Sequence, residues 1–126
     1  MMNGKGKLGK AGEEEVCKWL ISKGHTILER NWRAGKQEID IISLDRDGIH
    51  FVEVKSRTAP VQGEPEEAVN PAKQRNIVKA ARRFMTLKGN ELSDNLEIWF
   101  DIAAVTFDGG DVRLNYFPGA FVPIYV

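Results

Sequence analysis

Residues 38–57 read EIDIISLDRDGIHFVEVKSR and decide the fold. Polar and apolar residues alternate along residues 38–45 and again along residues 49–57, which is the period of β-strands. The residues between them, Arg46-Asp47-Gly48, suit a tight turn, because Asp-Gly between two alternating runs is a strong hairpin signal. This stretch therefore predicts a β-hairpin.

The segments on either side of the hairpin predict helices and further strands. Apolar residues recur at helical spacing over residues 10–23, and a second helix begins at Pro71 and ends near Gly89. Between hairpin and second helix, residues 58–71 predict a loop with room for a helical turn at residues 64–69. The remaining strands are expected at residues 25–32, 96–107 and 112–117. This order predicts an α/β fold with a central mixed β-sheet flanked by helices.

Length and composition are those of a folded domain. The chain has 126 residues, of which 42% are hydrophobic and 29% charged, so we expect one domain over residues 1–126. Its apolar runs are shorter than the roughly 20 residues that a membrane-spanning helix needs, and no apolar stretch of signal-peptide type follows the basic N-terminus. The one cysteine, Cys17, has no internal partner for a disulfide. We therefore expect a cytoplasmic protein with no membrane partner.

The charges balance overall but are unevenly distributed. Eighteen lysines and arginines match eighteen acids, so net charge provides no general attraction to a polyanion. Basic residues gather in the second predicted helix, among them Lys73 and Arg75, and leave a local basic surface. A charged outer face is also typical of surface helices. Gln74, in the same helix, could bind a phosphate or a water, although an exposed glutamine more often does neither.

The geometry of the turn decides whether Asp40, Glu53 and Lys55 meet. A two-residue turn at Asp47-Gly48 would pair Asp40 with Lys55, whereas a four-residue loop at residues 45–48 would place Asp40 opposite Glu53. Both registers put the three side chains on one face, because side chains alternate along a strand. A three-residue loop would send them to opposite faces.

These paired acids and the lysine are the groups that a phosphodiester hydrolase needs. Carboxylates at neighbouring cross-strand positions repel unless a cation lies between them, and oxygen ligands suit Mg²⁺ or Mn²⁺. Such an ion can polarise a phosphodiester oxygen. Lys55 could orient or deprotonate the attacking water, or neutralise charge on the phosphate. A salt bridge on a solvated sheet face explains the same residues equally well.

Four other polar residues receive no catalytic function from spacing alone. Glu13 follows the apolar stripe of the first helix, but a first-turn glutamate that complements the helix dipole is the simpler interpretation. His25 and His50 are far apart in sequence and lack metal-ligand spacing. Asp101 interrupts an apolar strand, where a basic partner on the second helix is expected.

Several motifs resemble the YraN family of bacterial proteins and together extend over nearly the whole chain. They are GKAGE at residues 9–13, LERNWR at 28–33, EIDII at 38–42, FVEVKSR at 51–57, EAV at 67–69, KQR at 73–75, FD at 100–101 and AF at 120–121. Gln37 stands where that family usually has glycine, and Val16 where it usually has alanine. Neither difference removes an expected metal ligand.

This resemblance implies a restriction-endonuclease-like fold, similar within that superfamily to the archaeal Holliday junction resolvases. The superfamily places an acid on the first helix, an aspartate on one strand and a Glu-x-Lys on the next around Mg²⁺. By similarity, the catalytic residues are Glu13, Asp40, Glu53 and Lys55, and the three acids among them are the metal ligands. The resemblance, and not the helical spacing, gives Glu13 this function.

Three functional hypotheses follow. The first is a metal-dependent endonuclease acting on DNA, including branched or otherwise structured DNA. The second is a nucleic-acid-binding protein without cleavage activity, and the third is an inert interaction module of the same fold. A homodimer would suit symmetric cutting of a junction, although the sequence identifies no interface. The candidate contacts with nucleic acid are Lys73, Gln74, Arg75 and Arg57.

Overall fold

The computed structural model describes residues 6–60, 70–93 and 95–122. Its elements in chain order are α1 (Lys7–Ser22), β1 (Thr26–Ala34), β2 (Gln37–Asp45), β3 (Gly48–Thr58), α2 (Pro71–Lys88), the 3₁₀ turn η2 (Gly89–Glu91), β4 (Ile98–Asp108) and β5 (Asp111–Phe117). The helices and strands predicted from the sequence are all present, with shifted ends. The helical turn expected at residues 64–69 lies outside the described residues.

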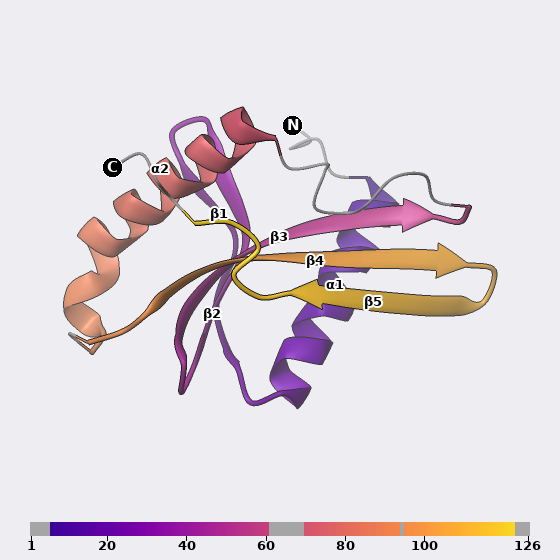
Figure 1. Ribbon diagram of the computed structural model, residues 1–126, viewed down its shortest axis with the longest axis horizontal. Helices are drawn as coiled ribbons and strands as arrows, with labels where there is room; N and C mark the ends of the chain where they lie inside the picture. The colour runs from indigo at the N-terminus through magenta and orange to yellow at the C-terminus, as the bar shows by residue number, and fades with distance from the viewer. Residues whose placement is uncertain (1–5, 61–69, 94, 123–126) are drawn as a thin grey trace.

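The strands form one sheet in the order β1-β2-β3-β4-β5. Strands β3 and β4 are parallel, and the other neighbouring pairs are antiparallel. Helix α2 lies in the connection between the two parallel strands, as such a crossover requires. In Figure 1, β3, β4 and β5 lie side by side, while β1 and β2 turn away from them. The predicted α/β fold with a central mixed sheet is confirmed.

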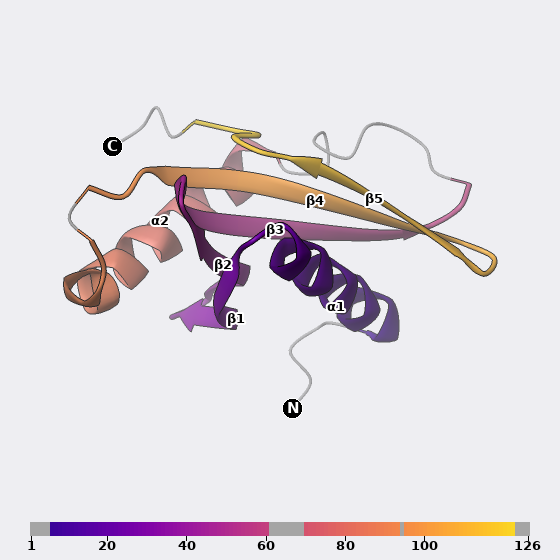
Figure 2. The same cartoon turned by 90° about the horizontal axis from the view of Figure 1, so that it is seen from below.

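The two helices cover opposite faces of this sheet, because successive residues of β3 pack against different helices. Phe51 belongs to an apolar cluster that contains Ile77 and Phe84 of α2. The next residue, Val52, belongs to a second cluster, with Leu20 of α1. Figure 2 shows α1 and α2 beside different parts of the twisted sheet. A cavity next to β3 can therefore receive residues from both helices.

Helix α2 begins as the sequence predicts. The Asn70 side chain accepts a hydrogen bond from the backbone N–H of Lys73 at 2.9 Å, and Pro71 occupies the first helical position. This cap fixes the point at which the first turn of α2 reaches the sheet. Within the described parts of the chain, no helix combines the length and apolarity that crossing a membrane requires.

The β2–β3 hairpin has the register in which Leu44 pairs with Ile49, and a closing pair of Asp45 with Gly48. The alternative with a turn at Asp47-Gly48 is therefore wrong. Gly48 has a φ of 141°, and a Cβ added there would lie 2.2 Å from the backbone oxygen of Glu97. Gly48 is needed because the chain entering β4 passes directly against it, and not because it forms the tip of the turn.

The expected pairing of Asp101 with a basic residue of α2 is wrong. Asp101 is fully buried in β4 and accepts hydrogen bonds from three other donors. These are His50 Nδ1 at 2.7 Å, the backbone N–H of Gly119 at 2.8 Å and the hydroxyl of Tyr116. Asp101 shares a face with Ala103, which packs towards α1 and not towards α2. Its charge is therefore satisfied by β3 and by the chain at and after β5.

Candidate functional site

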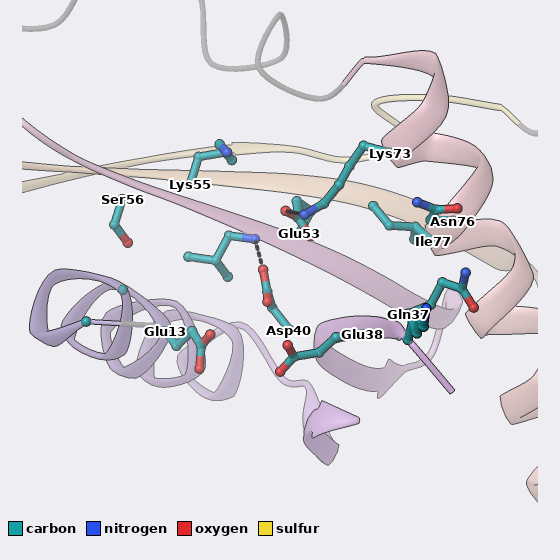
Figure 3. A pocket seen from close by; sticks show the side chains of 14 residues that line it. Glu13, Gln37, Glu38, Asp40, Glu53, Lys55, Ser56, Lys73, Asn76 and Ile77 are labelled. Atoms are coloured by element: carbon teal, nitrogen blue, oxygen red, sulfur yellow. Dashed lines mark hydrogen bonds and ion pairs between the residues drawn. The ribbon is translucent and has the colours of Figure 1, made fainter. Parts of the chain in front are cut away.

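A cavity of about 550 Å³ opens where α1, β2, β3 and the first turns of α2 meet (Figure 3). We call it the acidic cavity. It is lined by Gly6, Gly9, Glu13, Lys36, Gln37, Glu38, Asp40, Glu53, Val54, Lys55, Ser56, Lys73, Asn76 and Ile77. All four residues for which the family resemblance implies catalysis are in this set. The fold thus brings together an acid from α1, an acid from β2 and the Glu-x-Lys of β3.

Asp40 lies at the point where β2 separates from β3. The last residue pair before the cavity is Ile41 with Val52. Beyond it, the backbone N–H of Val54 donates a hydrogen bond to Asp40 Oδ2 at 2.8 Å, drawn as a dashed line in Figure 3. The carboxylate oxygen thus accepts a hydrogen bond from the β3 backbone, as a backbone carbonyl of β2 would if the strand pairing continued. This bond orients Asp40, whose side chain is buried at the cavity wall.

Glu53 is buried beside Asp40, one residue beyond the last pair of the hairpin. Burial and the negative charge of Asp40 raise the pKa of Glu53 from its ordinary 4.5 to about 7, against the opposing effect of Lys73. Two carboxylates held this close favour either a shared proton or a bound cation. Of the two registers considered from the sequence, the structure has the one that places Asp40 opposite Glu53.

Lys73 forms an ion pair with Glu53, which the sequence does not predict. Its Nζ lies 3.2 Å from Glu53 Oε2, and about half of the lysine side chain is exposed. Figure 3 shows Lys73 reaching down from the first turn of α2 to Glu53. One of the candidate nucleic-acid contacts therefore also supplies positive charge to the carboxylate pair.

Glu13 faces the cavity from α1 and is 2% exposed. Helix α1 begins at Lys7, so Glu13 lies in the second turn, and the interpretation as a dipole-complementing first-turn residue is wrong. The side-chain amide of Asn31 donates a hydrogen bond to Glu13 Oε1 at 3.1 Å. Asn31 has a φ of 52°, which is uncommon for a residue other than glycine, and this conformation occurs inside β1. Asn31 is thus a positioning residue for Glu13 that the sequence analysis missed.

Helix α1 approaches β3 closely at Gly12. A Cβ at this position would lie 1.8 Å from Ser56 Oγ and 3.0 Å from Ser56 Cβ. The Ser56 hydroxyl is buried and has no hydrogen-bond partner within the described residues. Because Gly12 directly precedes Glu13, this close approach places the glutamate at the cavity.

The remaining predicted residues lie around this centre at different distances. Lys55 and Arg57 follow Glu53 at every second position of β3, so the three side chains project from the same face. Lys55 lines the cavity, whereas Arg57 does not. Gln74 and Arg75 lie in the early turns of α2 next to Lys73, and neither lines the cavity.

Five further polar residues line the cavity but were not singled out for a function: Lys36, Gln37, Glu38, Ser56 and Asn76. Lys36 lies in the turn before β2 and Gln37 is the first residue of β2, where sequence patterns carry little information about side-chain direction. Asn76 lies three residues after Lys73 in α2, and this helical spacing could have identified it once Lys73 was placed at the site.

Comparison with known proteins identifies relatives over most of the chain. The profile of the Uncharacterised protein family UPF0102 matches residues 12–105. A UPF0102 protein of Anaeromyxobacter dehalogenans is 42% identical over 121 residues, which is 94% of this chain and 87% of the relative. One of Desulforapulum autotrophicum is 39% identical over 121 residues, which is 96% of this chain and 98% of the relative. One of Bacteroides thetaiotaomicron is 36% identical over 117 residues, 93% of each chain. The chain therefore belongs to the UPF0102 family, the YraN family that its motifs resemble.

Proposed function

We propose that this protein is a metal-dependent endonuclease that hydrolyses DNA phosphodiesters, with branched or structured DNA as its substrate class. The observation that carries the proposal is the pair of buried carboxylates at an open cavity. Asp40 and Glu53 are close enough that burial and mutual repulsion raise the pKa of Glu53 to about 7. A protein keeps such a pair at a cost to stability, so a cation that relieves the repulsion is the expected occupant.

The donor atoms fit Mg²⁺ or Mn²⁺. Asp40, Glu53 and Glu13 offer carboxylate oxygens only, which is the chemistry that these hard cations prefer. When bound, such an ion polarises a phosphodiester oxygen and lowers the pKa of a water. A mixed sheet with one helix on each face, and acids on α1, β2 and β3, also supports the restriction-endonuclease-like fold that the family resemblance implies.

The basic residues at and near the cavity would bind the substrate and assist proton transfer. Lys55 lines the same cavity and would orient the attacking water or neutralise the developing negative charge on the phosphate. Lys73, released from Glu53, would contact a neighbouring phosphate. The N-terminal end of α2 lies at the cavity, and the positive end of its dipole favours anions. Arg57, Gln74 and Arg75 extend this surface beyond the cavity.

Cleavage of labelled DNA tests the proposal. Purified protein is incubated with a four-way junction, a flap and a linear duplex in Mg²⁺ or Mn²⁺, and the products are separated by size. Asp40→Asn and Glu53→Gln should lower the cleavage rate by on the order of a hundredfold, the effect expected from losing one electrostatic contact to a developing charge. Asp40→Asn is the preferred variant, because an amide oxygen can still accept the Val54 hydrogen bond.

Adjacent glutamates on α1 provide a matched control. Glu13 is buried at the cavity, whereas Glu14 is exposed and pairs with Arg30 at 3.1 Å. Glu13→Gln should lower the rate, and Glu14→Gln should leave it unchanged. Mg²⁺ should also raise the melting temperature of the wild type and not that of Asp40→Asn. Absence of cleavage with every substrate and both metals, or equal rates for Asp40→Asn and wild type, would rule the proposal out.

The Lys73–Glu53 ion pair favours a second candidate function, binding of nucleic acid without cleavage. An ammonium group at 3.2 Å already offsets part of the negative charge of Glu53, so the cavity could retain lysine in place of a metal. The protein would then bind nucleic acid through its basic residues with an affinity that falls steeply with salt. Tight, salt-dependent binding with no turnover, together with no Mg²⁺-dependent stabilisation, would select this alternative.

A further inference from the structure

A second group of metal-ligating side chains lies outside the acidic cavity, at the closed end of the β2–β3 hairpin. It consists of His25, Asp45 and His50, which we call the histidine cluster. His25 Nε2 lies 3.2 Å from Asp45 Oδ2, and His50 Nε2 lies 2.9 Å from Asp45 Oδ1. One ligand atom from each residue lies within 4.8 Å of the others. The two imidazoles, 25 residues apart in sequence, thus point the same ring nitrogen at one carboxylate.

The other nitrogen of each imidazole has its own partner. His50 Nδ1 lies 2.7 Å from Asp101 Oδ2, and His25 Nδ1 lies 2.9 Å from Ser43 Oγ. Metal-ligating histidines almost always have such an outer contact, which fixes the orientation of the ring. A carboxylate behind His50 is the strongest form of this arrangement, because it raises the basicity of the ligating nitrogen.

The surroundings hold the cluster in place and leave Asp45 as its most exposed member. The Trp99 ring stacks on His50 with centroids 6.0 Å apart, and its Nε1 donates a hydrogen bond to the backbone oxygen of Asp47 in the turn. The side chains of His25 and His50 are each 7% exposed, and that of Asp45 is 15% exposed. An ion could therefore enter from the side of Asp45.

We propose that His25, Asp45 and His50 bind one Zn²⁺ ion, with the fourth position left to water. Ligands at about 2.0–2.1 Å from a tetrahedral Zn²⁺ lie roughly 3.3 Å from one another. The two His–Asp separations, 2.9 and 3.2 Å to different oxygens of Asp45, are close to this value, and the three ligand atoms all lie within 4.8 Å of one another, so movements of the side chains would admit the ion. Imidazole nitrogen selects first-row transition metals over Mg²⁺.

This zinc site is separate from the acidic cavity and does not rest on the proposed nuclease activity. Asp45 lies five residues along β2 from Asp40, which is roughly 16 Å in an extended strand. His50 shares the α1-facing side of β3 with Val52, whereas Glu53 projects to the other side. A bound ion would join the segment before β1, the end of β2 and the start of β3, and so stabilise the hairpin.

Nitrogen NMR of the wild-type protein with labelled histidine tests the site without any substitution. The chain has only two histidines, so both rings can be followed. One equivalent of Zn²⁺ should move both Nε2 signals to the range of metal-bound imidazole, and the melting temperature should rise. If neither ring responds to an excess of Zn²⁺, the proposal is wrong.

Calorimetric titration with variants separates this site from the acidic cavity. His25→Gln and Asp45→Asn should each weaken Zn²⁺ binding by more than about tenfold, and Ser43→Ala by about tenfold, the usual effect of losing an outer contact. Glu53→Gln, in the acidic cavity, is the control and should leave the affinity of this site unchanged. Zn²⁺ binding that survives His25→Gln but disappears in Glu53→Gln would place the ion in the acidic cavity and overturn the inference.

Discussion

The acidic cavity and the histidine cluster lie on the same hairpin but satisfy their charges in opposite ways. In the histidine cluster, Asp45 contacts two imidazoles, and Asp101 behind it accepts three hydrogen bonds. In the acidic cavity, Asp40 lies against Glu53, whose pKa rises to about 7 because of burial and this repulsion. One region is neutralised within the protein, while the other is only partly neutralised, by Lys73.

This difference separates a carboxylate that the protein itself satisfies, Asp101, from carboxylates that it leaves in mutual repulsion, Asp40 and Glu53. Both kinds are buried and both come from an alternating strand pattern, so burial alone does not distinguish them. What distinguishes them is the sign of their neighbours. A carboxylate surrounded by donors stabilises the chain, whereas two carboxylates in contact destabilise it until a cation arrives. Two substitutions test this distinction through stability alone, and a third tests the close approach of α1 to β3.

The largest effect is expected from Asp101→Ala. The substitution would leave three donors without their acceptor, those of His50, Tyr116 and Gly119. Removing one partner from a buried charged network costs about 3–5 kcal/mol of unfolding free energy. Urea denaturation followed by circular dichroism measures it. Exposed Asp108, which pairs with Arg113, offers a control, and Asp108→Ala should cost less than about 1 kcal/mol. Similar losses for the two variants would contradict a structural function for Asp101.

An intermediate, pH-dependent effect is expected from Glu53→Gln. Because the folded state raises the pKa of Glu53 from 4.5 to about 7, the folded protein holds this proton more tightly than the unfolded chain does. Ionisation of Glu53 therefore lowers stability progressively between pH 4.5 and 7, and the loss is complete above pH 7. Between pH 5 and pH 8 in EDTA, the wild type should lose about 2 kcal/mol relative to Glu53→Gln. A constant difference across this range would show that the carboxylates do not repel.

The smallest effect is expected from Gly12→Ala. The added methyl group would collide with Ser56, whose hydroxyl can rotate away but whose Cβ is also close. Overpacking of this kind should lower the unfolding free energy by about 1 kcal/mol. The double variant Gly12→Ala/Ser56→Gly removes the collision and should recover most of the loss. If it recovers nothing, the close approach of α1 to β3 does not depend on these two residues.

Much of the fold follows from local patterns in the sequence. The alternation over residues 38–57 predicts the hairpin, and the helical stripes predict α1 and α2. The proximity of Asp40 and Glu53 could also be predicted, because both registers considered for the hairpin leave the two side chains on one face. The register did not follow from the turn signal, because Gly48 lies beyond the tip of the turn, where its φ is 141° and the backbone of Glu97 passes against it. That contact comes from the residue just before β4, 49 positions further along the chain.

The contacts that complete the site depend on packing between distant segments. Lys73 meets Glu53 only because the first turn of α2 lies at the cavity beside β3, and Asn31 meets Glu13 only because α1 packs against the sheet beside β1. The partner expected for Asp101 was wrong for the same reason. The parallel register of β3 with β4 brings His50 next to it, and no local pattern encodes that register.

The Asp40 carboxylate both accepts a hydrogen bond from the Val54 backbone in the sheet and lines the cavity. A substitution at position 40 therefore has two effects at once, since a shorter side chain would remove an acceptor from the β3 backbone and a carboxylate from the cavity. Even without the proposed activity, the Val54 N–H would still favour an oxygen at this position. Asparagine at position 40 would keep an acceptor for the Val54 N–H, whereas alanine would leave this N–H without one and weaken the pairing of β2 with β3.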